Sequence, residues 1–347
     1  MRRWSALGAV LPALAATMGL PAADRTPSAH AAVRTQAAMR GRTAVHGQPQ
    51  AAAVRTQAAL RALAAVRVAD RLSAARGART AAALVAGGRY VAMGDSFTAG
   101  PMIPRQHGKP FACLRSDHNY PSLLARALKA GEFADVSCTA ATIADLFRPQ
   151  HVLFGENPAQ LDAVTPDTAL VTVGIGGNDV GFSKTFYTCA GLSLTAPKGA
   201  PCMKHFGTTL TDRVAAAAPR IATVLRSIHA HAPHAVVVVV GYLRILPSGT
   251  GCWPSVPAAA GDVPYLDRVE RSLNHMLAQE ARRGGALFVD DYRGGAGHDM
   301  CARTHRWVEP LLITHAAAPI HPNATGMRVV ADRVLDTLSA ARAAADR

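Results

Sequence analysis

From Arg89 onward, short apolar runs alternate with longer amphipathic stretches. Short runs rich in β-branched residues indicate buried strands, whereas stretches with an apolar position every three or four residues indicate helices. Strands that are apolar on both faces and separated by helices are typical of a parallel sheet covered on both sides. We therefore predict an α/β fold in three layers, with a central parallel sheet of about five strands. The predicted strands are 89–94, 135–138, 168–174, 235–242 and 286–290, and the predicted helices are 120–130, 209–231, 265–283 and 322–344.

The first 87 residues follow a different pattern. Arg2 and Arg3 precede the apolar run "ALGAVLPALAATMGLP", which predicts a signal peptide over residues 1–31. An uncleaved membrane anchor is the alternative interpretation. The sequence "AAVRTQAAMRG" then returns as "AAVRTQAALRA", so residues 32–87 are interpreted as an Ala/Arg-rich, low-complexity pro-segment or linker. Residues 88–347 are left as the predicted catalytic domain.

Charge is concentrated in the N-terminal part of the chain. The net charge is +14, but residues 1–88 hold 12 Arg, no Lys and 2 Asp, a net of +10. The remaining residues carry 25 basic against 21 acidic side chains, or +4. The predicted domain is therefore close to neutral, which argues against nucleic-acid binding. Transient contact of the basic N-terminal segment with an anionic cell envelope is the partner interaction that this charge suggests.

Cysteine usage agrees with export. None of the six cysteines forms a CxxC pair, so neither a zinc site nor a thioredoxin-like motif is predicted. An even number in an exported chain favours disulfides, for which fifteen pairings are possible. We take forward the sequential pairing, which closes loops of moderate length: Cys113–Cys138, Cys189–Cys202 and Cys252–Cys301.

Three short motifs place reactive side chains at predicted strand ends or helix starts: Ser96 in "AMGDSFTAG", Asn178 in "VGIGGNDVGF" and His321 in "APIHPNATG". Active sites of parallel sheets lie at the carboxyl ends of the strands. Each motif alone also has a plainer interpretation. Asp95 and Ser96 resemble a helix cap, "GGND" a turn, and His321 a surface residue at a helix start. The histidines of "HAHAPH" are interpreted as a helix end rather than a metal site.

Taken together, the motifs resemble a known family. The blocks "GDSFTAG", "SCTAATIAD", "GGND" and "HPN" occur in the order found in SGNH (GDSL-type) hydrolases. The six cysteines, "GHDMC" and "RWVEPL" are similar to the secreted actinobacterial lipase/esterase branch of that family. The resemblance covers about residues 88–345. It implies the flavodoxin-like SGNH hydrolase fold and a reaction that requires no metal and no organic cofactor.

The resemblance also implies roles for individual residues. Ser96 matches the nucleophile and His321 the general base. The oxyanion hole would consist of the backbone N–H groups of Ser96 and Ala140 and the side chain of Asn178.

Two positions depart from the family pattern. Ala140 stands where the second block normally has glycine, and Ala318 stands where the family often has an aspartate. We expect the main-chain carbonyl of Ala318 to orient His321 in a Ser–His dyad. Substitute acids are less favoured because they lie in a different loop region: Asp290, Asp291 and Asp299.

The leading expectation is a secreted, extracellular serine esterase or lipase that cleaves acyl esters through an acyl-enzyme. The low aromatic content and the lack of a long lid helix favour soluble or moderately long acyl esters. No nucleic acid and no obligate protein partner is expected. Three alternatives use the same site or scaffold: an acyltransferase, a carbohydrate or phospholipid esterase, and a non-catalytic envelope-binding protein.

Overall fold

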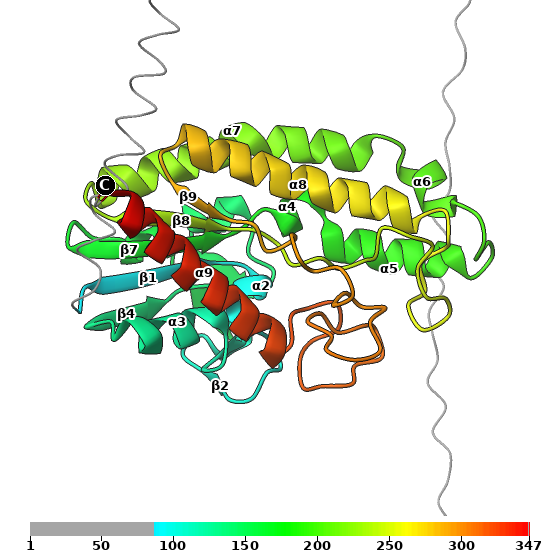
Figure 1. Ribbon diagram of the computed structural model, residues 1–347, viewed down its shortest axis with the longest axis horizontal. Helices are drawn as coiled ribbons and strands as arrows, with labels where there is room; N and C mark the ends of the chain where they lie inside the picture. Colours follow the sequence, from blue (N-terminus) through cyan, green and yellow to red (C-terminus); the bar gives the residue numbers. More distant parts are fainter. Residues whose placement is uncertain (1–86, 346) are drawn as a thin grey trace, which may run out of the picture. The chain divides into compact units, whose positions relative to one another are not determined.

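A five-stranded parallel sheet forms the centre of the computed structural model, which describes residues 87–345 and 347 (Figure 1). Every neighbouring pair in this sheet is parallel. The predicted three-layer α/β fold is therefore confirmed. In spatial order the strands are β4 (Glu132–Asp135), β1 (Arg89–Gly94), β7 (Thr168–Gly174), β8 (Val236–Val240) and β9 (Leu287–Val289).

Long helices cover both faces of the sheet (Figure 1). On one face lie α7 (Thr209–His231) and α8 (Val263–Arg283), and on the other lie α3 (Tyr120–Leu128) and α9 (Ala324–Ala345). The pattern of α8 explains its placement, because the residues that it buries recur every three or four positions: Leu266, Val269, Leu273 and Leu277. The five valines of β8 are all buried, as expected for a strand covered on both faces.

Two elements differ from the sequence prediction. The second strand was expected at 135–138 but is found at Glu132–Asp135, because β4 is an edge strand whose partly exposed residues give no apolar run. The connection after β7, for which the sequence predicted no helix before residue 209, is the second difference. It contains α5 (Phe182–Ser193) and α6 (Pro201–Phe206), which are joined by a disulfide.

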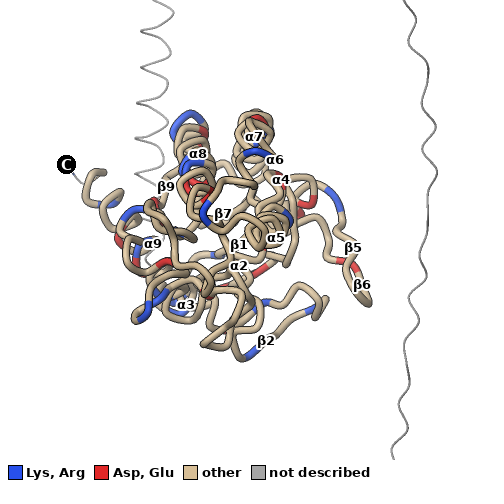
Figure 2. Tube along the Cα trace, turned by 90° about the vertical axis from the view of Figure 1, so that its right-hand side faces the viewer, with Lys and Arg blue, Asp and Glu red and all other residues tan. Residues whose placement is uncertain are grey.

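Short elements occupy the carboxyl ends of the strands. The helix α2 (Ser96–Ala99) follows β1, and α4 (Gly177–Val180) follows β7. Figure 2 views the molecule from this end, with the hairpin β5–β6 projecting to one side. The remaining short elements are β2 (Gln106–His107), η2 (Phe111–Cys113), β3 (Arg115–Ser116), η3 (Ile143–Leu146), β5 (Gln150–Val152), β6 (Gly155–Asn157) and η4 (Gln160–Ala163).

Three disulfides join the cysteines in sequential order: Cys113–Cys138, Cys189–Cys202 and Cys252–Cys301. Within residues 87–345, no helix is long and apolar enough to cross a membrane. The predicted signal peptide at 1–31 and the predicted linker at 32–87 lie outside the described residues, apart from Gly87.

Candidate active site

Ser96 lies at the first position of α2, one residue after the end of the inner strand β1. Gly94 makes this turn possible: its φ is +154°, and a Cβ there would lie 2.2 Å from the Thr98 Oγ1 and 2.6 Å from the Gly174 carbonyl oxygen. Asp95 is the N-cap residue of α2, and its carboxylate accepts a hydrogen bond from the Phe97 N–H. The chain thus leaves the sheet abruptly and holds the Ser96 hydroxyl at its carboxyl edge.

His321 lies against Ser96, although the two residues are 225 positions apart. Its Nε2 is 2.7 Å from the Ser96 Oγ, and its Nδ1 is 2.7 Å from the carbonyl oxygen of Pro319. Burial lowers the pKa of His321, while the bond to the Pro319 carbonyl opposes this shift. The imidazole is therefore neutral at pH 7 and able to accept a proton from the hydroxyl.

The expectation for Ala318 was wrong. A main-chain carbonyl does meet Nδ1, but it belongs to Pro319. The Ala318 carbonyl instead accepts a hydrogen bond from the backbone N–H of His321 at 3.2 Å. The cause is Ile320, whose φ of +66° turns the Pro319 carbonyl towards the ring.

The acids considered as substitutes are bound elsewhere. Asp291 is paired with Arg333, Asp290 accepts a hydrogen bond from the Arg293 N–H, and Asp299 accepts one from the Cys301 N–H. Across residues 87–345, no carboxylate is hydrogen-bonded to His321. The arrangement is therefore a dyad with a carbonyl as the orienting group.

Three N–H donors are candidates for an oxyanion hole: the backbone N–H groups of Ser96 and Ala140, and the side chain of Asn178, which lines the same cavity as Ser96. The backbone N–H groups of Ser96 and Ala140 have no acceptor among the described residues, so both are free to bind an oxyanion. Asn178 uses one side-chain N–H to bind the Ala141 carbonyl at 2.9 Å, which leaves the second available. Ala140 has a φ of +64°, the left-handed conformation that explains why glycine is common in this block.

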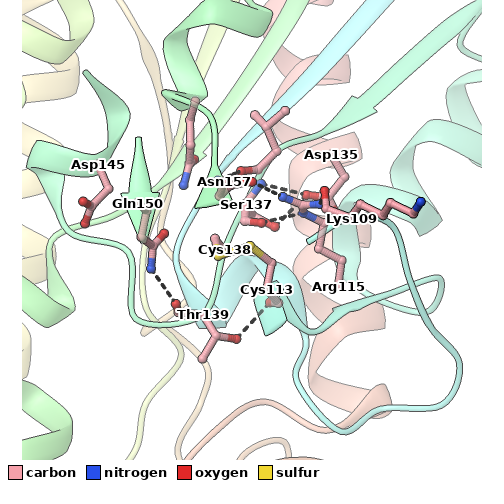
Figure 3. The surroundings of a disulfide bond; sticks show 12 residues. Lys109, Cys113, Arg115, Asp135, Ser137, Cys138, Thr139, Asp145, Gln150 and Asn157 are labelled. Carbon is pink, nitrogen blue, oxygen red and sulfur yellow. Dashed lines mark hydrogen bonds between the residues drawn. A yellow bond between two sulfur atoms is a disulfide. The ribbon is translucent and has the colours of Figure 1, made fainter. Parts of the chain in front are cut away.

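The loop that carries Ala140 is fixed by the Cys113–Cys138 disulfide (Figure 3). Thr139 donates hydrogen bonds from its backbone and its hydroxyl to the Cys113 carbonyl, and its own carbonyl accepts one from Gln150. Beside the disulfide, the buried Arg115 donates to the Ser137 carbonyl at 2.6 Å. Thr139, the residue before Ala140, is therefore held by hydrogen bonds to both Cys113 and Gln150.

A second network joins the turn at Ser96 to the turn at Asn178. The Tyr242 hydroxyl donates to Asp95 at 2.6 Å and accepts from the Gly177 N–H at 2.7 Å. Burial raises the pKa of Asp95 to about 7, against the lowering effect of the bonds from Tyr242 and Phe97. Tyr242 thereby links the turn that carries Ser96 to the turn that carries Asn178.

Two adjoining cavities lie near the dyad, and the first of them is lined by Ser96 itself. The first is lined by Ser96 and Asn178 together with apolar side chains, including Phe97 and Leu273. The second is almost entirely apolar and shares three lining residues with the first: Phe182, Ile245 and Glu270. Burial raises the pKa of Glu270 well above its usual range, which favours the neutral acid in this apolar setting.

The model of the GDSL-like lipase/acylhydrolase family matches residues 92–329 of this chain. The chain belongs to this family. It is 40% identical over 255 residues to Lipase 2 of Streptomyces coelicolor, which corresponds to 72% of this chain and 85% of that protein. It is 30% identical over 293 residues to an esterase of Streptomyces scabiei, covering 72% of this chain and 85% of that one.

Solved structures of similar proteins agree with this membership. Phospholipase A1 from Streptomyces albidoflavus NA297 matches with a TM-score of 0.63 and 26% identity, covering 73% of this chain and 100% of that chain. The extracellular lipase from Streptomyces rimosus matches with a TM-score of 0.62 and 25% identity, covering 72% and 100%. As a member of the GDSL-like family, the chain is a hydrolase of carboxylic esters.

Sequence reasoning missed several residues that build this hydrolase site. Tyr242 and Pro319 gave no signal of their own. The role of Tyr242 depends on residues far away in the sequence, and that of Pro319 depends on the conformation of the next residue.

In the described part of the chain, no group of three or more His, Cys, Asp and Glu side chains could hold a metal ion. The histidines of "HAHAPH" include His229, bonded to the Gly284 carbonyl, and His231, bonded to the Ser227 carbonyl.

Proposed function

We propose that this GDSL-family hydrolase acts through an acyl-enzyme on Ser96, with His321 as the general base. The observation that carries the proposal is the 2.7 Å hydrogen bond from the Ser96 hydroxyl to a neutral, carbonyl-oriented imidazole. In the first step, Nε2 takes the hydroxyl proton while Oγ attacks the ester carbonyl carbon. The imidazolium then gives this proton to the leaving alcohol as the tetrahedral intermediate collapses.

Three donors stabilise the negative oxygen of that intermediate in this mechanism: the Ser96 N–H, the Ala140 N–H and the Asn178 side chain. Their available N–H groups, and the cavity that Asn178 lines together with Ser96, support this role. Deacylation repeats the sequence with water, which His321 deprotonates before it attacks the acyl carbon. The imidazolium then gives this proton to the leaving Ser96 Oγ as the second tetrahedral intermediate collapses, which releases the free acid and restores the hydroxyl.

The apolar side chains that line the cavity at Ser96 and the cavity next to it support an acyl group of aliphatic character as the part of the ester that is recognised. The acyl chain attached to Ser96 would extend past Phe182 and Ile245, the two apolar side chains that line both cavities. Three disulfides support an oxidising, extracellular location, in keeping with the export signal inferred from the sequence.

Hydrolysis of p-nitrophenyl acetate, butyrate, octanoate and palmitate by the full chain tests this function. We expect Ser96→Ala and His321→Ala each to lower kcat by at least about 10³-fold, as in other serine hydrolases. A fluorophosphonate should label the wild type at Ser96. Turnover that survives Ser96→Ala, or a folded wild type that cleaves no ester, would contradict the proposal.

A further inference from the structure

The segment before His321 is folded back on itself by Glu309. The backbone N–H of Glu309 donates to the His321 carbonyl at 2.9 Å, and the Glu309 carbonyl accepts from the Ile320 N–H at 2.8 Å. The neighbouring pair, Val308 and Pro322, forms an antiparallel bridge. The backbone of Glu309 therefore binds both Ile320 and His321, the two residues whose backbone sets the position of the imidazole.

The side chain of Glu309 secures the same segment from inside. Its carboxylate is fully buried and accepts hydrogen bonds from the Asn323 side chain at 2.8 Å, the Thr314 N–H at 2.7 Å and the His315 Nδ1 at 2.8 Å. The Thr314 hydroxyl and the His315 N–H also donate to it. Burial opposes its ionisation, but these bonds outweigh burial and hold the pKa of Glu309 at about 2. A carboxylate with this many donors is a rigid, ionised anchor.

The anchor fixes a backbone conformation that is otherwise disfavoured. Ile320 has a φ of +66°, a left-handed conformation that is rare for a β-branched residue. This conformation points the Pro319 carbonyl at Nδ1. Such strain persists only where the surroundings enforce it. Glu309 holds the Ile320 backbone in this conformation through its own backbone hydrogen bonds. The Glu309 side chain is in turn bound by Asn323, the residue just before α9.

We propose that Glu309 is the positioning residue of the catalytic histidine. It acts indirectly in place of the acid that often orients the histidine in this family. Glu309 holds the Pro319 carbonyl in place, and this carbonyl, not Glu309, contacts the ring. This inference rests on the proposed role of His321 as general base.

A prediction about pH follows from the contacts of His321. The ring meets the Ser96 hydroxyl, the Phe97 ring and the Pro319 carbonyl, and no charged side chain of residues 87–345 is bonded to it. Two basic side chains lie near the Glu309 carboxylate: His315, which is in contact with it, and Arg306, which binds the Thr314 hydroxyl. The hydrogen bond to the Pro319 carbonyl raises the pKa of His321. A variant that weakens this hydrogen bond should therefore lower the pKa further. The acid limb of kcat/KM should then move to lower pH.

The decisive variant is Glu309→Gln, which keeps the shape of the side chain. It replaces one carboxylate oxygen, which accepts hydrogen bonds, with an NH₂ group that faces the same donors. We expect kcat to fall about 10- to 100-fold with KM within about twofold, since a small misplacement of a catalytic group costs this much. The pKa of His321, followed by NMR titration of its ring protons, should fall below the wild-type value, because the Pro319 carbonyl that raises it is less well placed. This second readout does not depend on ester turnover, so it separates a failure of this inference from a failure of the proposed function.

Two further variants complete the test. Glu156→Gln makes the same chemical change at a half-exposed glutamate that pairs with His151 on the β5–β6 hairpin, and it should leave kcat and the titration unchanged. Thr314→Val combined with His315→Ala keeps the Glu309 charge but removes two of its donors. This double variant should show a smaller change in the same direction, and it decides the question if Glu309→Gln does not fold. Wild-type kcat and a wild-type His321 titration in whichever of the two variants folds would overturn the inference.

Discussion

The two halves of the dyad are built in different ways. Ser96 follows a buried strand, and its turn is tied through Asp95 and Tyr242 to the turn that carries Asn178. His321 follows an irregular loop whose conformation depends on one buried carboxylate, Glu309. The sheet therefore positions the nucleophile, whereas side-chain hydrogen bonds position the base.

This difference predicts different responses to mutation. Changes on the sheet side should alter transition-state stabilisation or the stability of the fold, and they should leave the titration of His321 as it is. Changes on the loop side should alter that titration. The following three substitutions on the sheet side test this contrast with Glu309→Gln.

The largest effect is expected from Asn178→Ala. The variant removes one proposed oxyanion donor, and the loss of such a donor typically costs 10²- to 10³-fold in kcat. Steady-state kinetics on p-nitrophenyl butyrate should show this fall with little change in KM and no movement of the acid limb. A fall of less than about threefold would mean that the two backbone donors suffice.

An intermediate effect is expected from Tyr242→Phe. The variant leaves the buried Asp95 Oδ2 without its donor and the Gly177 N–H without its acceptor, while the Phe97 N–H still binds Asp95 Oδ1. We expect the free energy of unfolding in urea to fall by about 1–3 kcal/mol and kcat by roughly tenfold.

The pH dependence of this destabilisation has a defined sign. The Asp95 pKa is already raised above its unfolded value, to about 7, and loss of the hydroxyl raises it further. The stability that this group contributes is lost as the pH rises through its folded pKa, so the deficit should be larger at pH 9 than at pH 5. Tyr187→Phe, at an exposed tyrosine on α5, is the matched control and should be neutral. An equal deficit at both pH values would show that Asp95 is not the group involved.

The smallest effect is expected from Ala140→Gly. Its φ of +64° disfavours alanine by about 1–2 kcal/mol, and the extra entropy of an unfolded glycine offsets about 0.5–1 kcal/mol of any gain. Thermal unfolding should therefore show a stability equal to the wild type or slightly higher. Because the backbone N–H remains, kcat should change less than twofold. A tenfold change would mean that the alanine methyl group shapes the oxyanion hole.

The same contrast explains how far the sequence could predict this molecule. The strands β1, β7 and β8 were predictable because burial on both faces leaves continuous apolar runs, and α7 because its apolar residues recur with helical spacing. Ser96, Asn178 and His321 stood out because they lie in short motifs. The orienting carbonyl was misassigned by one residue, since its direction is set by the backbone of Ile320, which leaves no trace in residue types. Glu309 was not singled out because all its partners are defined by tertiary contacts.

The order of the two catalytic residues along the chain has a consequence for folding. Ser96 follows the first strand of the sheet, whereas His321 comes after the last strand and immediately before α9. Because α9 packs on α3, which follows Ser96, the dyad exists only after the two ends of this domain have met. A partly assembled chain has a nucleophile without a base. Ester turnover should therefore report the completion of folding, and recovery of activity after dilution from denaturant should coincide with the slowest tertiary step.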